Sequence, residues 1–490
     1  MKHFELVLLF IFFLPLLVKA QAVNFDNYFI DKTMRIDYYH IGDASSEFIT
    51  LDKVYQYGTW AGSLKNLIDN FNNGKYYFKI YDDASNNLIY SKGFDSYFGE
   101  YKTSDDGLKN IKRTYHESAI IPYPKGKIIF AVETRQKDNS LKEFYRTVID
   151  PADLSIIREN IKDKSVKVFN SLKSGNPHVK ADIVILAEGY TAKEEQKFKN
   201  DLDRFTKIFF NQEPYKSNKN KFNFYGVFKA SEESGVDEPD HNSFKKTVLS
   251  CTFYSLGSER YLLTEDNKTM RDLAGQVPYD AIYIMVNHKR YGGGGIYNLF
   301  CTFTADNQWC DYLFLHEFGH SFSGLADEYY TSDVSYNDFY PKGVEPVEPN
   351  ITALLDKDNI KWKQFLTSGI EIPTPWEKAV YDSTDLAWQV KRREQNNKIA
   401  EFKRNHVPDA QVAKLQAEYD STDRVHQKWI DDYLHSSKYW NKVGAFEGAG
   451  YASRGIYRSM LDCIMFSKGK KPYCKVCEES IKHVINFYSE

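Results

Sequence analysis

After its first twenty residues, the chain begins with short runs in which apolar and polar positions alternate. Examples are KYYFKIYD (75–82), NLIYSKGF (87–94) and KIIFAVET (127–134), which are rich in Tyr, Phe, Ile and Val. Turn-forming clusters such as DDASNN and PYPKG separate these runs, and this spacing is typical of an antiparallel sandwich. We therefore predict an all-β sandwich domain over residues 21–150. A linker over 151–180 follows, with the breaker SGNP near its end.

Beyond residue 180 the pattern changes to that of an α+β domain, which we place at 181–490. The apolar run IVILA (183–187) predicts a buried strand, and Thr191 with Glu194 forms a capping box that opens a helix. A second buried strand is predicted at AIYIMVN (281–287). Four consecutive glycines (292–295) then precede an apolar strand, which indicates backbone that a ligand or another chain approaches closely. A plain flexible loop is the alternative.

A charged stretch over 382–435 predicts two helices joined by a turn at Val407-Pro408. We interpret it as a helical insertion in the α+β domain. The basic run 391–393 is more typical of a solvated helix face than of a site for an anionic partner. The pattern does not indicate the role of this insertion.

Composition narrows the class of protein. The chain has 490 residues, 42% hydrophobic, with a formal net charge of −3. This near balance argues against the broad cationic surface that phosphate backbones require, so we expect no nucleic-acid partner. The first twenty residues resemble a secretory signal peptide cut after Ala20, since the apolar run 6–18 is too short to cross a bilayer. We expect a secreted or periplasmic protein without a membrane span after signal removal; a retained anchor is the alternative.

All six cysteines lie in the second half of the chain. An even number in an exported protein favours disulfide bonds, although the sequence does not choose among the fifteen possible pairings. Free thiols are a second possibility. The third is a metal or redox site that includes the Cys474-x-x-Cys477 pair.

The segment LHEFGHSFSGLADEYY (315–330) concentrates metal-ligand side chains on a predicted helix, residues 311–323, that ends at Gly324. His316 and His320 are four residues apart, so both imidazoles lie on one helix face and can hold one zinc ion. Glu317 can then act as the general base that activates zinc-bound water. The alternative is a helix with two surface histidines. The histidines outside this segment have no ligand spacing, and we expect them to be structural or solvated.

A catalytic zinc needs a third protein ligand, and the acids after Gly324 can supply it. The turn at this glycine favours Asp327. Glu328 remains the alternative, or it hydrogen-bonds a ligating histidine. The downstream segment GYASRGIYRS offers a donor for the negative charge that develops on the reacting oxygen, and among its tyrosines and arginines we favour Tyr457.

Three segments resemble the IgA-peptidase-like family of bacterial zinc metallopeptidases. They are LHEFGHSFSGLADEYY (315–330), ADIVILAEGYT (181–191) and GAFEGAGYASRGIYRSMLDCIM (444–465). The resemblance implies a metzincin-like catalytic domain with a methionine turn beneath the metal, for which Met465 is the candidate and Met460 the reserve. It also implies that Gly293, Gly294 and Gly295 lead into the edge strand on which substrate pairs. The N-terminal β domain resembles the N-terminal module of the same family.

The chain departs from the usual metzincin spacing. Gly324 follows the second histidine by four residues instead of three, and Asp327 follows it by seven instead of six. The third ligand is also a carboxylate instead of an imidazole.

The sequence therefore predicts a zinc-dependent endopeptidase that acts on proteins or peptides outside the cytoplasm. A non-catalytic surface binding module and a zinc aminopeptidase are the alternatives. Neither the natural substrate nor the oligomeric state follows from the pattern.

Overall fold

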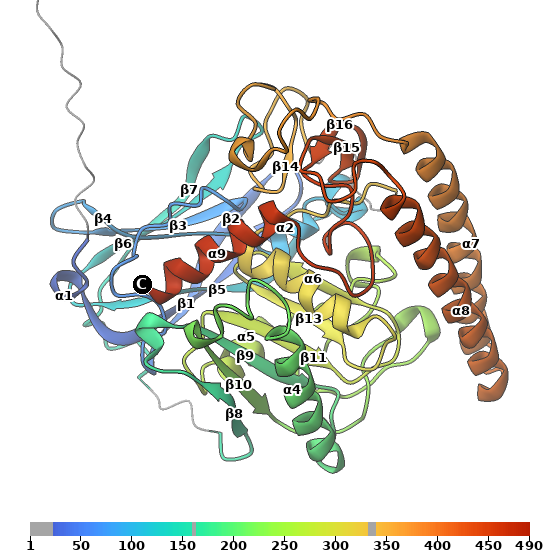
Figure 1. Cartoon of the computed structure of the whole chain (residues 1–490). Helices are drawn as coiled ribbons and strands as arrows, with labels where there is room; N and C mark the ends of the chain where they lie inside the picture. The colour runs from blue at the N-terminus through green and yellow to red at the C-terminus, as the bar shows by residue number, and fades with distance from the viewer. Residues whose placement is uncertain (1–22, 159–162, 332–339) are drawn as a thin grey trace, which may run out of the picture.

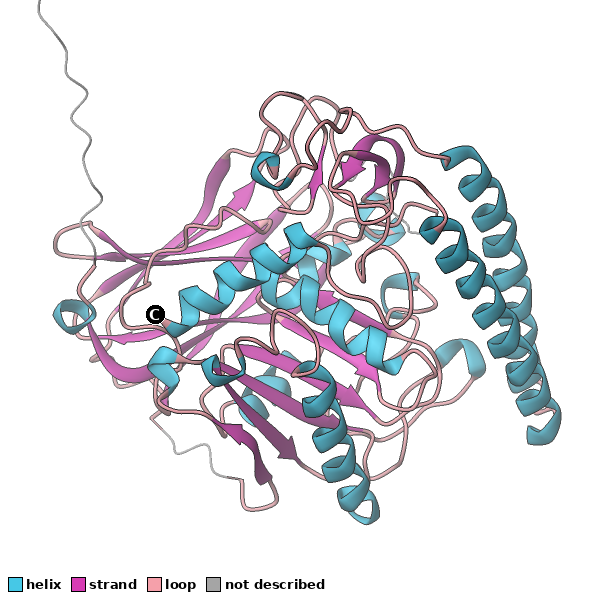
Figure 2. Ribbon diagram, in the orientation of Figure 1, coloured by secondary structure: helices cyan, strands magenta, loops and turns pink. Residues whose placement is uncertain are grey.

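The computed structural model describes residues 23–158, 163–331 and 340–490, so the predicted signal peptide lies outside the described residues. Two antiparallel sheets form the N-terminal region (Figures 1 and 2), with strand orders β2-β1-β5 and β4-β3-β6-β7. Ile36 of one sheet and Phe78 and Phe130 of the other belong to one buried cluster. This region is β-rich, as predicted. Its strands are β1 (Phe29–Gly42), β2 (Glu47–Tyr57), β3 (Tyr76–Asp82), β4 (Leu88–Phe94), β5 (Arg113–Pro124), β6 (Ile128–Arg135) and β7 (Leu141–Ile149). Its short helices are α1 (Phe25–Tyr28), α2 (Tyr97–Tyr101) and α3 (Asp105–Leu108).

Part of the predicted linker is a strand. β8 (Lys167–Lys173) pairs antiparallel with β10 (Phe222–Phe228) at the edge of the next sheet. The prediction of a linker over 151–180 is therefore wrong for this segment. β8 is half-exposed and polar, and an edge strand of this kind carries little of the apolar signal that marks a buried strand.

The second region is built on a six-stranded mixed sheet of order β12-β13-β11-β9-β10-β8. Its four inner strands are parallel, whereas the two edge strands run antiparallel to their neighbours. β9 is buried along its whole length because helices or other chain segments cover both faces of the sheet. The remaining strands are β9 (Ala181–Glu188), β11 (Ala281–Val286), β12 (Gly293–Ile296) and β13 (Phe300–Thr304).

Helices cover the two faces of this sheet. α4 (Glu195–Phe209), α6 (Cys310–Ser323) and α9 (Lys475–Ser489) pack on one face, whereas α5 (Asn267–Ala274) packs on the other. Figure 1 shows α6 and α9 side by side across the sheet. A small three-stranded sheet lies beyond α6; it consists of β14 (Ile351–Thr352), β15 (Phe446–Ala449) and β16 (Ala452–Arg458).

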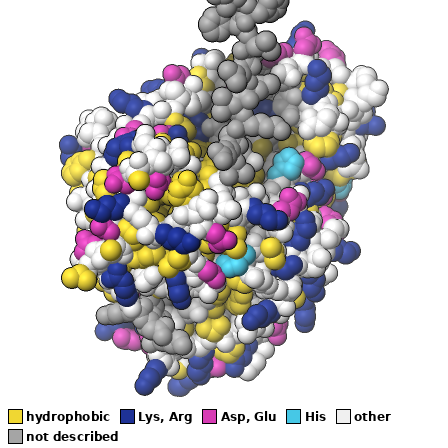
Figure 3. Space-filling view, turned by 90° about the vertical axis from the view of Figure 1, so that its left-hand side faces the viewer, with side chains coloured by type: hydrophobic (Ala, Val, Ile, Leu, Met, Phe, Trp, Pro, Cys, Tyr) yellow, Lys and Arg dark blue, Asp and Glu magenta, His cyan; other side chains and the backbone are white. Residues whose placement is uncertain are grey.

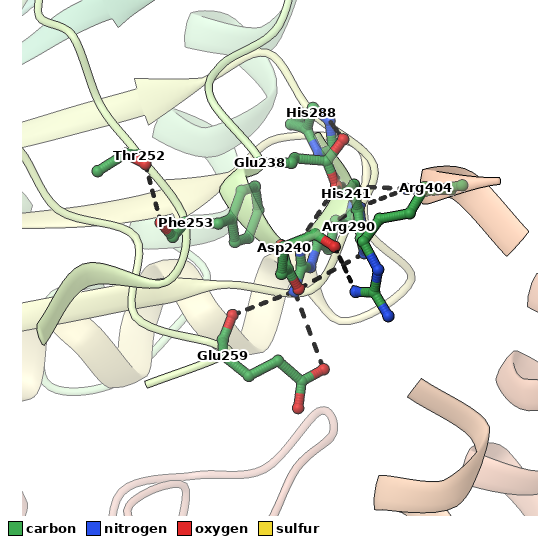
Figure 4. Close-up of polar contacts among 10 residues, drawn as sticks. Glu238, Asp240, His241, Thr252, Phe253, Glu259, His288, Arg290 and Arg404 are labelled. Carbon is green, nitrogen blue, oxygen red and sulfur yellow. Dashed lines mark hydrogen bonds and ion pairs between the residues drawn. The ribbon is translucent and has the colours of Figure 1, made fainter. Parts of the chain in front are cut away.

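The charged stretch forms the two predicted helices, α7 (Lys378–Arg404) and α8 (Asp409–His435), which project as a pair at the right of Figure 1. Asp423 of α8 accepts a 2.6 Å hydrogen bond from the Trp309 indole before α6. Near its C-terminal end, α7 contacts a loop that precedes the sheet's third parallel strand. Figure 4 shows this contact, where Arg404 donates to the carbonyl oxygen of Asp240 at 2.7 Å.

Two histidines that the sequence leaves single belong to the same loop network (Figure 4). His241 lies 2.6 Å from Glu238, and His288 lies 3.4 Å from that carboxylate. Arg290 pairs with Asp240 at 2.7 Å. These polar contacts give the two histidines structural roles, as predicted.

Polar contacts connect the N-terminal region to the second region. Arg35 pairs with Asp272 at 2.6 Å, and Asn73 donates to the carbonyl oxygen of Gly324 at 3.1 Å. Acidic and basic side chains are intermixed on the face drawn in Figure 3, in keeping with the balanced net charge. Among the described residues, no helix combines the length and apolar character that crossing a bilayer requires.

The cysteines differ from the expectation of disulfide bonds. All six lie in the described ranges, where they are buried free thiols. The sulfurs of Cys463 and Cys477 are 3.9 Å apart, whereas a disulfide needs about 2.05 Å. The sequence could not reveal this because pairing depends on which cysteines the fold brings together.

Candidate active site

The predicted histidine helix is α6, which begins one residue earlier than expected and ends at Ser323. Gly324 caps it in the left-handed region, with φ 59°, and its N–H bonds back to the carbonyl of His320. A glycine suits this position because it has no Cβ to clash there. The chain therefore turns sharply at Gly324 and returns over the histidine face.

This return places Asp327 against both imidazoles. The Nε2 atoms of His316 and His320 are 3.1 Å apart, and Oδ1 of Asp327 lies 3.0 and 3.2 Å from them. Ligands at zinc–nitrogen distances of about 2.0–2.1 Å in a tetrahedral site are about 3.3 Å apart. The three atoms therefore have the spacing of a metal-ligand triangle.

Backbone carbonyls orient the two rings. Nδ1 of His316 lies 3.0 Å from the carbonyl oxygen of Ile464, and Nδ1 of His320 lies 2.6 Å from that of Leu325. Each Nδ1–H can donate to its carbonyl, which leaves the Nε2 lone pairs directed at the centre of the triangle. Asp327 Oδ1 is buried, and it faces the Nε2 atoms of both histidines. Three lone-pair atoms in such proximity repel one another unless a cation lies between them, so the group fits a metal ion.

The charges of the triangle support the same conclusion. Burial opposes ionisation of Asp327, but the histidines outweigh it and hold the pKa of Asp327 well below its usual range. Burial likewise opposes protonation of His320, but Asp327 outweighs it and raises the pKa of His320 to about 9. A proton on His320 thus takes the place that a metal cation would fill, and metal binding would release it.

The second acid of the segment, Glu328, points away from the triangle. Its carboxylate accepts a 3.1 Å hydrogen bond from Asn350 and lies 3.4 Å from the sulfur of Cys477. Its backbone N–H donates to the carbonyl oxygen of Met465 at 2.8 Å. Asp327 and Glu328 therefore face opposite sides of one chain segment.

Glu317 lies at the cleft beside the triangle. Burial raises its pKa above the usual range for a glutamate. A Cβ on Gly293 would lie 3.2 Å from its carboxylate, which places the glycine-rich strand directly over this acid. A raised pKa lets this carboxylate bind a proton more readily than an exposed glutamate does, which suits a group that takes and returns a proton.

β12 is the edge strand that the glycines were predicted to enter. A Cβ on Gly295 would lie 2.4 Å from the carbonyl oxygen of Glu317, so the strand approaches α6 too closely for a larger residue. The outer edge is bonded at Gly293 to Arg260 and Leu262, and at Tyr297 to Asp95. In a β-strand every second residue directs its N–H and C=O groups to the same edge. Gly295 therefore directs its backbone groups to the same edge as Gly293, at a position between the contacts of Gly293 and Tyr297.

Met465 packs against the histidine helix. It is fully buried, and a Cβ on Gly319 would lie 2.8 Å from its sulfur. Met460, the reserve candidate, is only partly buried. The preceding residue, Ile464, supplies the carbonyl for His316. The turn that carries Met465 therefore lies against the helix between the two histidines.

The structure does not bring Tyr457 to the site. Tyr457 lies in β16, opposite Thr352 and Glu447, and is not among the described residues that line the cleft. Tyr451 takes the nearer position, and its hydroxyl donates to Oδ2 of Asp327. The choice of Tyr457 is wrong because the five residues between these tyrosines are strand positions of β16, which lead away from the metal-ligand triangle.

Sequence reasoning missed four further residues of the cleft. Arg260 donates a 2.8 Å hydrogen bond to the hydroxyl of Tyr329, and both line the cleft with Glu317. The N-terminal region adds Asn73 and Arg135 to the lining of the cleft. Tyr329 lay within the histidine segment, but Arg260 lies in a loop without any motif, so no pattern pointed to it.

Comparison with known proteins agrees with this geometry. The family model described as IgA Peptidase M64 matches residues 170–485, and that described as Peptidase M64 N-terminus matches residues 24–146. No curated protein matches the sequence. The first model alone covers well over half of the chain. The chain therefore belongs to the IgA Peptidase M64 family and is a peptidase, a hydrolase for which a metal-dependent mechanism fits.

Proposed function

We propose that this protein is a zinc-dependent endopeptidase in which His316, His320 and Asp327 hold the ion. The carrying observation is the triangle of ligand atoms with sides of 3.0–3.2 Å beside Glu317. Nitrogen and oxygen ligands in this number suit a catalytic zinc, which keeps a position open for reaction. A zinc ion bound there supplies Lewis acidity and makes water nucleophilic near neutral pH.

Glu317 is the proposed general base. Its carboxylate takes the proton of the attacking water and later delivers it to the leaving amine. The raised pKa of Glu317, which burial causes, suits both transfers. Arg260 and Tyr329 are proposed to stabilise the negative charge that develops on the carbonyl oxygen, because a guanidinium and a hydroxyl donor meet at this wall of the cleft.

The catalytic region is proposed to be metzincin-like. Support comes from the glycine that caps the histidine helix, the buried methionine turn against Gly319 and the antiparallel edge strand β12. An extended substrate would pair with the backbone of Gly295, which favours internal cleavage over terminal trimming. We also propose export to the periplasm or the cell exterior, because residues 1–20 have the composition of a signal peptide.

The test is Glu317→Gln, which keeps the shape of the side chain but removes its basicity. We expect cleavage of casein or a peptide library to fall by about 10²–10⁴-fold while bound zinc is unchanged, because Glu317 is not a ligand. Asp311→Asn, at the start of the same helix, is the matched control and should retain activity. Activity of the Glu317 variant within tenfold of wild type would contradict the proposal, and products trimmed only from one terminus would favour an aminopeptidase.

A further inference from the structure

A second cluster of ligand-type side chains lies behind the candidate active site. Cys463, Cys474, Cys477 and Glu328 are each at most 3% exposed. One ligand atom from each lies within 4.8 Å of those of the others. The proposed peptidase mechanism uses none of these side chains.

The spacing of the four atoms is close to that of a tetrahedral zinc site. The sulfurs of Cys463 and Cys477 are 3.9 Å apart, and Oε1 of Glu328 lies 3.9 Å from Cys474 and 3.4 Å from Cys477. Thiolate ligands at about 2.3 Å from zinc are about 3.8 Å apart in a tetrahedron. The cluster therefore needs little movement to surround an ion.

Hydrogen bonds around the sulfurs favour thiolates. The backbone N–H of Cys474 points at the sulfur of Cys463 at 3.1 Å, and that of Cys477 points at the sulfur of Cys474 at 3.4 Å. The second pair lies at the start of α9, where the partial positive charge of a helix N-terminus also favours an anion.

Packing of the three thiols does not by itself explain why Glu328 is buried beside them. It is fully buried, and its Oε2 atom finds no hydrogen-bond partner among the described residues. A buried carboxylate without full pairing is costly. The fully buried Arg458 lies within electrostatic reach of Glu328 but bonds to backbone carbonyls of Gly448 and Leu461. A metal ligated by this carboxylate would remove the cost.

We propose that Cys463, Cys474, Cys477 and Glu328 form a second, structural site that binds a zinc ion. The thiols that are still protonated release their protons as the ion binds, and no oxidant or reductant is required. A zinc ion bound here would hold together two chain segments that contribute to the candidate active site, the one that carries Glu328 and the one that carries Cys463. Glu328 adjoins Asp327, and Cys463 adjoins Ile464 and Met465, whose carbonyls bond to His316 and to the N–H of Glu328.

The test measures the number of zinc ions bound per molecule of the full-length protein, purified without chelator. Wild type is expected to hold two zinc ions, and the His316→Ala/His320→Ala double variant one. Cys477→Ser is expected to lose one ion, whereas Cys310→Ser, a buried cysteine outside the cluster, should keep both. Wild type reconstituted with cobalt(II) should show near-ultraviolet thiolate-to-cobalt absorption. The double histidine variant should retain it, and Cys477→Ser should lose it.

Two outcomes would overturn the proposal. The first is a wild-type cobalt spectrum without thiolate absorption. The second is a disulfide among residues 463–477 in peptides from unreduced protein. Both are measured on wild type, so they decide even where Cys477→Ser does not fold. If instead the proposed catalytic zinc site were wrong, wild type would hold one ion and show thiolate-to-cobalt absorption. The double histidine variant would then match wild type in both measurements, so the two failures are distinguishable.

Discussion

At the scale of single residues, the chemistry of the site depends on where each side chain is held. Tyr451 illustrates this, since its φ of 62° is unusual for a non-glycine residue and its hydroxyl donates to Asp327. Strain of this kind persists only where surrounding contacts impose it. The hydroxyl fixes one carboxylate oxygen, so the other is free to face the two imidazoles.

Tyr451→Phe is therefore expected to weaken zinc binding. Removing a group that orients a ligand costs about 10–100-fold in metal affinity. The measurement is the free zinc concentration that restores half of the activity in chelator-stripped protein. Tyr457→Phe is the matched control, because Tyr457 lies outside the cleft lining, and it should leave this concentration unchanged. Equal effects of the two substitutions would show that Tyr451 does not position Asp327.

At the scale of elements, the site depends on the contact between β12 and α6. The strand lies so close to the helix that a Cβ on Gly295 would be 2.4 Å from the carbonyl oxygen of Glu317 and 2.9 Å from Cβ of His320. Neither obstacle is the flexible end of a side chain. The glycines of β12 therefore allow the strand to lie close to α6. This role is separate from any contact that they make with substrate.

Gly295→Ala is expected to push β12 away from α6 and displace Glu317 and His320. A misplacement of about 1 Å at a reacting group can cost about 10²-fold in rate. We expect kcat/KM to fall by about that factor. Gly126→Ala is the control, because a Cβ there meets nothing within 4 Å. A Gly295 variant with wild-type kcat/KM would contradict this account of the strand–helix contact.

At the scale of the whole molecule, the cleft lies where the N-terminal region meets the peptidase region. Asn73 and Arg135 line one wall, and Asn73 also holds the carbonyl of Gly324 at the end of the histidine helix. Arg35 adds a partly buried ion pair with Asp272 across the same boundary, and Asn267 adds a buried hydrogen bond to Ser118. The N-terminal region therefore supports the site directly.

Because the Asn73 and Asn267 hydrogen bonds across this boundary are buried, the two regions are expected to unfold together. Calorimetry of the metal-loaded protein should show one transition, with a calorimetric enthalpy close to the van't Hoff value. Asn267→Ala removes a 2.8 Å hydrogen bond to Ser118 and should lower Tm without splitting the peak, at a cost of about 1–3 kcal/mol. Two resolved transitions in wild type would show that the regions are independent.

The sequence by itself predicted the features that depend on local spacing. Period-2 alternation predicted the β-rich region, and the helical period with Gly324 predicted α6. His316 and His320 share a helix face because four residues make about one turn. The two helices of the insertion were predicted from their helical period and from the break at Pro408, which are also local features of the sequence.

Only the tertiary structure decided the features that join distant segments. β8 appeared as a linker because an edge strand has a weak apolar pattern, and Tyr457 was preferred to Tyr451 because spacing does not show which way a side chain faces. Arg260 and the cluster of Glu328 with three cysteines come together from segments far apart in the chain. Local periodicity reports which face of an element is buried, whereas contacts across the fold depend on how the faces pack, and no local pattern encodes this.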